Sequence, residues 1–303
     1  MTAEPVTTDR TEGAAEPGPE PEPLANGPLF ASYPVRAHHR FDPVDPEGEP
    51  DVGADFHEAT KLHPALSAYV TGPAEQLWTP GYESVPNEGL ATRRWYTRAH
   101  PLPVPEPVDR TLSEVVAQRV STSPPGAEGL TAAELSSVLF LAYGATPVPG
   151  DPRVHRRPVP SGGALYPLDL YVAVGPEGLG DSEIGSGLFH YDPFRHCLEE
   201  LRDGRGWDQV VTASIAQSTV RGSSVVLCMV ACFARQTGKY GERGYRFTYL
   251  EAGHVGQNVG LACTGLGLGC LPFASIYDAA VEQALGVDGL HESLVHTVLL
   301  GRR

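Results

Sequence analysis

Several widespread sequence patterns are missing from this chain of 303 residues, and each absence excludes a class of protein. The five cysteines form no Cys-x-x-Cys pair and are odd in number, so we expect neither a metal site nor a disulfide framework. No run of about 18 apolar residues occurs, which predicts that no segment crosses a membrane. Residues 1–20 lack a basic start followed by an apolar run, so no signal peptide is expected. Together these features predict a cytoplasmic protein.

Positive charge is scarce as well. The formal net charge is −15, and residues 1–60 carry 13 acidic against 3 basic residues. Because phosphates would be repelled and no basic stripe is present, we expect no nucleic-acid partner. The same segment holds 10 of the 29 prolines. We predict that residues 1–50 form an acidic, proline-rich, disordered tail, because such a segment cannot bury enough apolar surface to offset its ordering entropy.

The signatures of several enzyme classes are also absent. No H-E-x-x-H string, no G-x-S-x-G string and no G-x-x-x-x-G-K-[ST] loop occurs, so ordinary hydrolysis has no support. The GLGLG string at residues 265–269 follows a predicted helix, whereas a Rossmann fingerprint joins a strand to a helix. A Rossmann nucleotide site is therefore not expected. His57 and His63 would not share one helix face, so we assign them surface or packing roles rather than metal binding.

What the chain does contain is a mixture of helical and strand patterns. Capping boxes that begin at Thr111 and Thr131 predict helices over residues 111–120 and 132–143. Apolar spacing and flanking breakers predict four more helices, over residues 55–64, 208–217, 245–265 and 277–285. Apolar runs predict strands over residues 168–174, 223–233 and 294–300, with a hairpin over residues 187–201. This order predicts an α+β fold with helices on both faces of a sheet.

One stretch, PSGGALYP at Pro160–Pro167, stands directly before the predicted strand 168–174. Its Ser161, Gly162 and Gly163 leave the backbone bare, so that its N–H groups can approach a flat ligand. An ordinary turn is the alternative for this stretch taken alone. Three further distinctive strings follow along the chain, in the order KYGERGYRF, EAGHVGQN and GLGLG.

Taken together and in this order, these strings resemble the flavin-dependent SagB-type dehydrogenases, which have the nitroreductase fold. The resemblance covers residues 111–303 and implies an FMN-binding domain with a mixed, mainly antiparallel sheet, present as a homodimer. Residues 51–110 would then be an N-terminal extension. Its proline-rich part, residues 79–110, is predicted to be an extended arm that lies on its own body or on a partner chain.

The resemblance also implies how the chain would hold FMN. Arg119, Ser121 and Ser123 stand where the family has an Arg-x-Ser-x-Arg pattern for the flavin phosphate, and Ser123 replaces the second arginine. An arginine suits this role because its planar fork takes two phosphate oxygens at once. The resemblance implies three further contacts. The loop Ser161, Gly162 and Gly163 contacts the flavin, often from the partner subunit. The backbone of Phe273, Ala274 and Ser275 approaches the flavin N5, and Arg302 reaches the phosphate.

A Lys-Tyr pair before a Gly-x-Arg string stands at Lys239 and Tyr240. It resembles the family branch that oxidises azolines in ribosomally made peptides, which implies that Lys239 acts as base and that Tyr240 relays a proton. Arg243 or Arg246 could supply a cation that keeps the amine neutral. The implied substrate is an azoline-containing precursor peptide, and a cyclodehydratase complex is a further implied partner. Three alternatives stay open: a SagB-type enzyme acting on another peptide group or small molecule, a flavin-free scaffold of the same fold, and a solvated lysine beside a packing tyrosine.

Overall fold

The computed structural model describes residues 52–61, 94–122 and 124–303 of the chain. Residues Phe56–Arg303 form one compact unit. The predicted tail, much of the predicted extension and the predicted phosphate contact Ser123 lie outside the described residues and stay predictions. A short helix, α2 (Val52–Ala59), begins earlier than the helix that the sequence predicts over residues 55–64.

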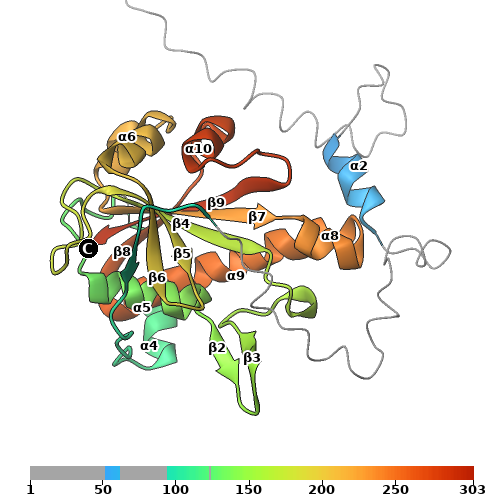
Figure 1. Cartoon of the computed structure of the whole chain (residues 1–303), viewed down its shortest axis with the longest axis horizontal. Helices are drawn as coiled ribbons and strands as arrows, with labels where there is room; N and C mark the ends of the chain where they lie inside the picture. Colours follow the sequence, from blue (N-terminus) through green and yellow to red (C-terminus); the bar gives the residue numbers. More distant parts are fainter. Residues whose placement is uncertain (1–51, 62–93, 123) are drawn as a thin grey trace, which may run out of the picture. The chain divides into compact units, whose positions relative to one another are not determined.

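Seven strands form one sheet at the centre of the unit, in the order β1-β6-β5-β4-β7-β9-β8 (Figure 1). Every neighbouring pair of strands is antiparallel. The central strands β4 (Leu168–Val174) and β7 (Val225–Cys232) are buried along almost their whole length. This burial on both faces explains why β7 is a continuous apolar run and β4 is apolar except for Asp169. The other strands are β1 (Arg98–Pro101), β5 (Gly187–Asp192), β6 (Cys197–Arg202), β8 (Leu268–Phe273) and β9 (Glu292–Arg302), and β2 (Thr146–Val148) pairs with β3 (Asp151–Arg156) in a separate ribbon.

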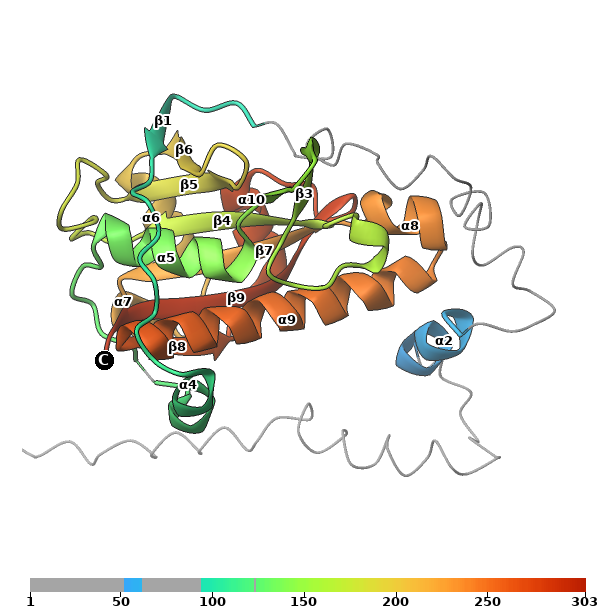
Figure 2. The same ribbon diagram turned by 90° about the horizontal axis from the view of Figure 1, so that it is seen from below.

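Helices cover both faces of the sheet, as Figure 1 shows. On one face α5 (Ala132–Tyr143) and α9 (Arg243–Leu266) pack together over a large apolar cluster, and they run side by side in Figure 2. On the other face α6 (Gly204–Thr212) and α10 (Asp278–Leu285) cover a second cluster. The short helices are α4 (Leu112–Gln118), α7 (Gln217–Arg221) and α8 (Ala234–Tyr240). Within the described residues, no helix is long and apolar enough to cross a bilayer.

Local sequence signals account for where most of these helices and strands begin and end. The two predicted capping boxes are present, with Thr111 and Thr131 each accepting from the backbone three residues on. The single helix predicted over residues 208–217 is wrong, because the chain forms α6 and α7 with a break between them. In that break Ser214 bridges Ile276, and the N–H of Ile215 donates to the carbonyl of Ser275 at 2.8 Å. This long-range pairing overrides the helical spacing.

A bulge in β9 turns one histidine toward α9. Met229 of β7 pairs with His296, but the next residue, Val230, pairs with Leu294, so Val295 is the extra residue. Leu294 accordingly packs in the cluster under α10, although it has the same strand parity as His296. A bulge commonly re-aims a side chain in this way. The Nε2 atom of His296 comes so close to α9 that a Cβ at Gly256 would lie 2.9 Å from it.

Candidate functional site

The bare loop at Ser161–Gly163 lies against the end of α8. Gly163 has a φ of 64°, which favours glycine. A Cβ placed on Gly163 would lie 2.7 Å from both the Nζ of Lys239 and the hydroxyl oxygen of Tyr240. The two stretches that the sequence singled out separately, the glycine loop and the Lys-Tyr pair, are therefore one site.

Lys239 and Tyr240 are the last two residues of α8, and Gly241 with a φ of 56° turns the chain away after them. The Lys239 amine lies 5.2 Å from the centroid of the Tyr240 ring. That ring packs edge-on against Phe247 of α9, with 5.0 Å between centroids. Both side chains are half-buried. A helix end therefore lets two adjacent side chains face the same loop, which an extended backbone would not allow.

The two candidate cations have other partners. The guanidinium of Arg243 donates to the carbonyl oxygen of Thr60 at 3.2 Å and lies 5.7 Å from the Phe247 ring centroid. The Nε of Arg246 donates to the Thr60 hydroxyl at 2.5 Å. In the described part of the chain, neither guanidinium is recorded in contact with Lys239. A direct effect of either cation on that amine thus stays a prediction.

Two buried polar residues lie beside the loop, and the sequence assigned a role to neither of them, although Glu251 begins the EAGHVGQN string. Gln236 is fully buried, and its Nε2 donates to the carbonyl of Gly162 at 3.2 Å. Glu251 is 1% exposed and accepts a hydrogen bond from the Tyr143 hydroxyl at 2.7 Å. Burial raises the pKa of Glu251 to about 7, against the opposing effect of the hydroxyls of Ser161 and Tyr143. The signal that could have identified Glu251 is a single carboxylate beside a run of small, apolar residues in the helix predicted over residues 245–265.

A second region with the character of a binding site lies along the middle of α9 and toward its C-terminal end. A cavity of about 180 Å³ opens there, and its lining residues are Arg119, Val120, Gly253, Gly256, Gln257, Gly260, Cys270, Pro272 and His296. Arg119 follows α4 in extended conformation and is exposed, and no carboxylate partner is recorded for it among the described residues. The N–H of Thr122 donates to the Cys270 carbonyl at 2.8 Å, which ties this segment to β8. Burial lowers the pKa of His296.

The other predicted cofactor residues lie around the end of β8 and the end of the chain. Phe273 is buried, and its carbonyl accepts from the hydroxyl of Thr297. Ala274 and Ser275 follow it and are exposed, as is Ser121 near Arg119. The guanidinium of Arg302 instead forms an ion pair with Glu134 of α5 and donates to the carbonyl of Gly129 at 3.4 Å. A phosphate at Arg302 would have to compete with that carboxylate.

The two regions are well separated in one chain. The side chain of Phe247 lies beside the glycine loop, whereas Gly260 lies beside Arg119. These two residues belong to the same helix, and a rise of about 1.5 Å per residue puts about 20 Å between them. The loop and Arg119 of one chain are therefore far apart along α9, although the cavity lining reaches back to Gly253.

The residues present fit a flavin mononucleotide in two respects. The cavity at Arg119 offers an arginine with no recorded ion pair, which suits an anionic phosphate. The loop offers two adjacent glycines, whose backbone carries no side chain, which suits a flat ring that approaches the main chain closely. No group of three or more His, Cys, Asp or Glu side chains in the described ranges is placed to hold a metal ion.

Comparison with known proteins defines the class. Residues 116–302, more than half of the chain, match the Nitroreductase family, and the chain belongs to that family. Protein MJ1384 of Methanocaldococcus jannaschii, which is named for the same family, is 35% identical over 184 residues, or 61% of this chain and 88% of that protein.

Two further relatives have more specific names. The microcin B17-processing protein McbC of Escherichia coli is 31% identical over 147 residues, or 46% of this chain and 51% of McbC. The trifolitoxin-processing protein TfxB of Rhizobium leguminosarum bv. trifolii is 30% identical over 151 residues, or 48% of this chain and 40% of TfxB. The matched region thus spans about half of either relative or less. Both relatives agree with the resemblance to SagB-type dehydrogenases.

Solved structures share the fold. A chain of the E. coli microcin synthetase complex McbBCD, solved with truncated pro-MccB17 bound, superposes with a TM-score of 0.55 at 22% identity, over 83% of this chain and 92% of that one. A protein of Ralstonia eutropha JMP134 that is named as a nitroreductase superposes with a TM-score of 0.54 at 23% identity, over 68% of this chain and 90% of that one. The predicted nitroreductase-like α+β fold is confirmed, and the predicted homodimer stays a prediction.

Proposed function

We propose that the protein is an FMN-dependent dehydrogenase that oxidises thiazoline or oxazoline rings of a ribosomally made peptide to thiazoles or oxazoles. The observation that carries this proposal is the convergence of the Lys239 amine and the Tyr240 hydroxyl on the bare backbone of Gly163. Membership of the Nitroreductase family supports an oxidoreductase. The names of McbC and TfxB, both peptide-processing proteins, support a peptide substrate.

The cofactor would be held by residues from several elements. Arg119, Ser121 and Ser123 would hold the phosphate, with Arg302 as a weaker contributor because of its pair with Glu134. The remaining contacts, to the ring system, would come from Ser161, Gly162, Gly163 and the backbone of Phe273, Ala274 and Ser275. When bound, FMN supplies an acceptor for two electrons and a proton, which the side chains of a protein cannot provide.

The lysine is the unusual residue of the site. The chain has twenty arginines and only two lysines, Lys61 and Lys239. An arginine stays protonated in proteins, whereas a lysine amine can lose its proton and act as a base. Azoline-to-azole conversion removes two electrons and two protons: a hydride leaves one ring carbon, and a proton leaves another atom of the ring. Lys239 would accept that proton, and the Tyr240 hydroxyl would relay or donate it.

The complete site would need two chains. In one chain, Phe247 beside the loop and Gly260 beside Arg119 stand about 20 Å apart along α9. Exposed apolar side chains lie on α9 and on or just after α4, and apolar patches of this kind mark protein contacts. They are Leu112, Val116, Val120, Tyr249 and Leu250. A homodimer would cover these side chains and bring the loop of one chain to the cavity of its partner.

The proposal is tested with purified protein and an azoline-containing peptide. We expect a yellow dimer that releases FMN on acid treatment, and a peptide that loses two hydrogens per ring by mass spectrometry. If the protein binds FMN but leaves azolines intact while oxidising another group, the alternative of a different substrate holds. Light scattering that shows a flavin-loaded monomer would contradict the two-chain site.

Two specific observations favour a second candidate, a flavin-free scaffold of the same fold. The second arginine of the phosphate pattern is replaced by Ser123, and Arg302 is engaged by Glu134. Both features reduce the positive charge available to a phosphate. A colourless protein that takes up no added FMN would establish the scaffold and overturn the enzyme. A partner cyclodehydratase, suggested by the McbBCD complex, would be compatible with either candidate.

A further inference from the structure

The loop that meets Lys239 and Tyr240 is strained. Gly163 has a positive φ, and so do two residues that are not glycine, Ala164 at 54° and Tyr166 at 46°. Residues with a Cβ rarely adopt this region, because the side chain crowds the neighbouring backbone. Such a conformation persists only where the surrounding structure holds it in place, and it often marks a functional site.

Hydrogen bonds from three directions hold this loop. Within the loop, the N–H of Tyr166 donates to the Ser161 hydroxyl oxygen at 2.9 Å. From α8, Gln236 donates to the carbonyl of Gly162 at 3.2 Å, and Arg235 donates to the carbonyl of Tyr166 at 3.1 Å. Arg157, which precedes the loop, donates its N–H to the Tyr166 hydroxyl at 3.2 Å.

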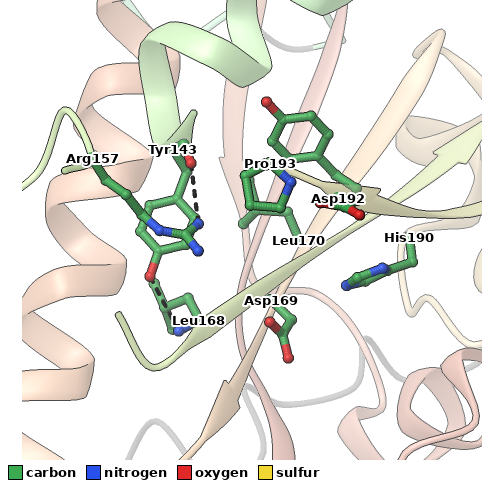
Figure 3. Close-up of a pocket in the computed structure, with 9 residues that line it drawn as sticks. Tyr143, Arg157, Leu168, Asp169, Leu170, His190, Asp192 and Pro193 are labelled. Carbon is green, nitrogen blue, oxygen red and sulfur yellow. Dashed lines mark hydrogen bonds between the residues drawn. The ribbon is translucent and has the colours of Figure 1, made fainter. Parts of the chain in front are cut away.

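Glu251 is bonded through Tyr143 to one end of the loop and lies near its other end. Its carboxylate accepts from the Tyr143 hydroxyl at 2.7 Å, and the same hydroxyl accepts from the N–H of Leu168, directly after the loop, at 3.2 Å. Figure 3 shows this bond to Leu168 and the guanidinium of Arg157 beside the Tyr143 ring, 4.1 Å from its centroid. At the other end, the Ser161 hydroxyl lies close enough to Glu251 to favour its ionised form, while the Oε2 atom of Glu251 is buried without a hydrogen-bond partner among the described residues.

We propose that Glu251 is a positioning residue, which holds the strained loop through its hydrogen bond to Tyr143 and through its charge beside the Ser161 hydroxyl, so that Gly163 stays next to Lys239 and Tyr240. The inference deepens the proposed function, and it rests on that function for its kinetic readout alone. The position of the loop can be measured without any substrate.

The charge of Glu251 makes this positioning dependent on pH. An ionised carboxylate can accept from Ser161 and Tyr143 together, whereas a protonated one loses part of that capacity. Burial raises its pKa to about 7. The charged and titratable groups that face it are Tyr143 of α5, Arg157 before the loop and Arg235 of α8. The loop should therefore be held firmly above neutral pH and loosen as the pH falls through about 7.

The test compares wild type with Glu251→Gln, which keeps the size of the side chain but cannot ionise. Hydrogen exchange of the peptide over residues 158–167 is measured on both sides of neutral pH and corrected for intrinsic exchange. We expect several-fold faster exchange in wild type below neutral pH, and no such step in the variant. With azoline peptide, we expect kcat of wild type to fall across the same pH interval and kcat of the variant to lose that step, with KM unchanged.

The matched control is Glu199→Gln, because Glu199 of β6 is also buried but pairs with His190 of β5. This change should leave the pH step of the loop intact. A step that persists in Glu251→Gln, or that also vanishes in Glu199→Gln, would overturn the inference. If Glu251→Gln does not fold, Tyr143→Phe removes the other member of the contact and should also speed loop exchange. Normal loop behaviour without azoline turnover would count against the proposed function only.

Discussion

The two ends of α9 differ in how far they are organised before any ligand arrives. At the loop end, Ser161–Gly163 is fixed by buried partners, and Lys239 and Tyr240 already point at one glycine. At the other end, Arg119 and Ser121 are exposed, and the cavity beside them is open. A preorganised region favours chemistry, because orientation is provided in advance. An open, charged region favours capture of an anion, which itself completes the site.

The largest expected effect is on the organised end. Lys239→Ala should lower azoline turnover by about a hundredfold to ten-thousandfold, the usual cost of removing a positioned base. FMN binding should stay near wild type, because the proposed phosphate contact Arg119 lies beside Gly260, far along α9 from Lys239. Steady-state kinetics and flavin titration of the same preparation measure both quantities.

The control for Lys239→Ala is Lys61→Ala, since Lys61 is the only other lysine and pairs with Glu58 at the surface. It should leave turnover unchanged. Tyr240→Phe keeps the ring and removes only the hydroxyl. Near-wild-type turnover of both site variants would make the pair structural, whereas loss of FMN in Lys239→Ala would make Lys239 a cofactor ligand.

The second prediction concerns how the burial of Glu251 beside the loop changes the stability of the fold with pH. Folding raises the pKa of Glu251 from its ordinary value of 4.5 to about 7, mainly through burial. The folded state therefore favours the protonated carboxyl of Glu251. Its contribution to the free energy of unfolding is fully present below pH 4.5 and is lost as the pH rises through about 7. The loss amounts to at most about 3 kcal/mol. Urea unfolding across this pH interval should show the free energy of unfolding declining in wild type and not in Glu251→Gln. The same dependence of that free energy on pH in both proteins would contradict the prediction.

This result would sharpen the comparison, because the state that holds the loop best is the ionised one. Above neutral pH the loop is positioned firmly while the fold as a whole is less stable. The open end carries no comparable cost, since its Arg119 remains in contact with water. Buried polar groups at functional sites commonly show this conflict between stability and activity.

Sequence patterns were sufficient for the elements with strong local signals and for the identity of the two regions. Thr111 and Thr131 cap the helices they predict, and the apolar runs became β4 and β7. Residue type and order also identified the glycine loop and the Lys-Tyr pair. The contact between them depends on how α8 crosses α9, where a Cβ on Gly244 would lie 2.7 Å from the backbone of Gln236. No local pattern contains that crossing.

The residues that escaped prediction depend on pairing between distant parts of the chain. His296 faces α9 only because of the bulge at Val295. Gln236 and Glu251 have a role at the site only because the fold brings the loop Ser161–Gly163 next to both of them. The scarcity of lysine was a usable signal, since it marks Lys239 as a residue that arginine does not replace. The isolated carboxylate of Glu251 among small residues was another.

The third prediction acts on the open end. Arg119→Ala should weaken FMN binding by about tenfold to a hundredfold, because a hydrogen bond to a charged group contributes roughly 1.5–3 kcal/mol. Arg302→Ala should have a smaller effect, because Arg302 is already paired with Glu134. Flavin titration at low and high salt measures both, and the Arg119 contribution should be the more sensitive to salt. A larger loss from Arg302→Ala would reverse the roles of the two arginines.

The smallest expected effect returns to the loop and tests contact rather than chemistry. Gly163→Ala introduces a Cβ at a φ of 64°, where it meets the flexible ends of Lys239 and Tyr240 at 2.7 Å. Those ends can move, so the protein should fold with a loss of roughly 1–2 kcal/mol from the backbone conformation. The displaced amine should then lower turnover by about tenfold, equivalent to ~1.4 kcal/mol of barrier.

The control Gly238→Ala lies one residue before Lys239 in the helix, and nothing stands within 4 Å of its Cβ. Since alanine favours a helix interior, that control should be slightly more stable and fully active. Equal turnover in both variants would show that the position of Gly163 does not govern the Lys-Tyr pair, and the loop end would then be no better organised for catalysis than the open end.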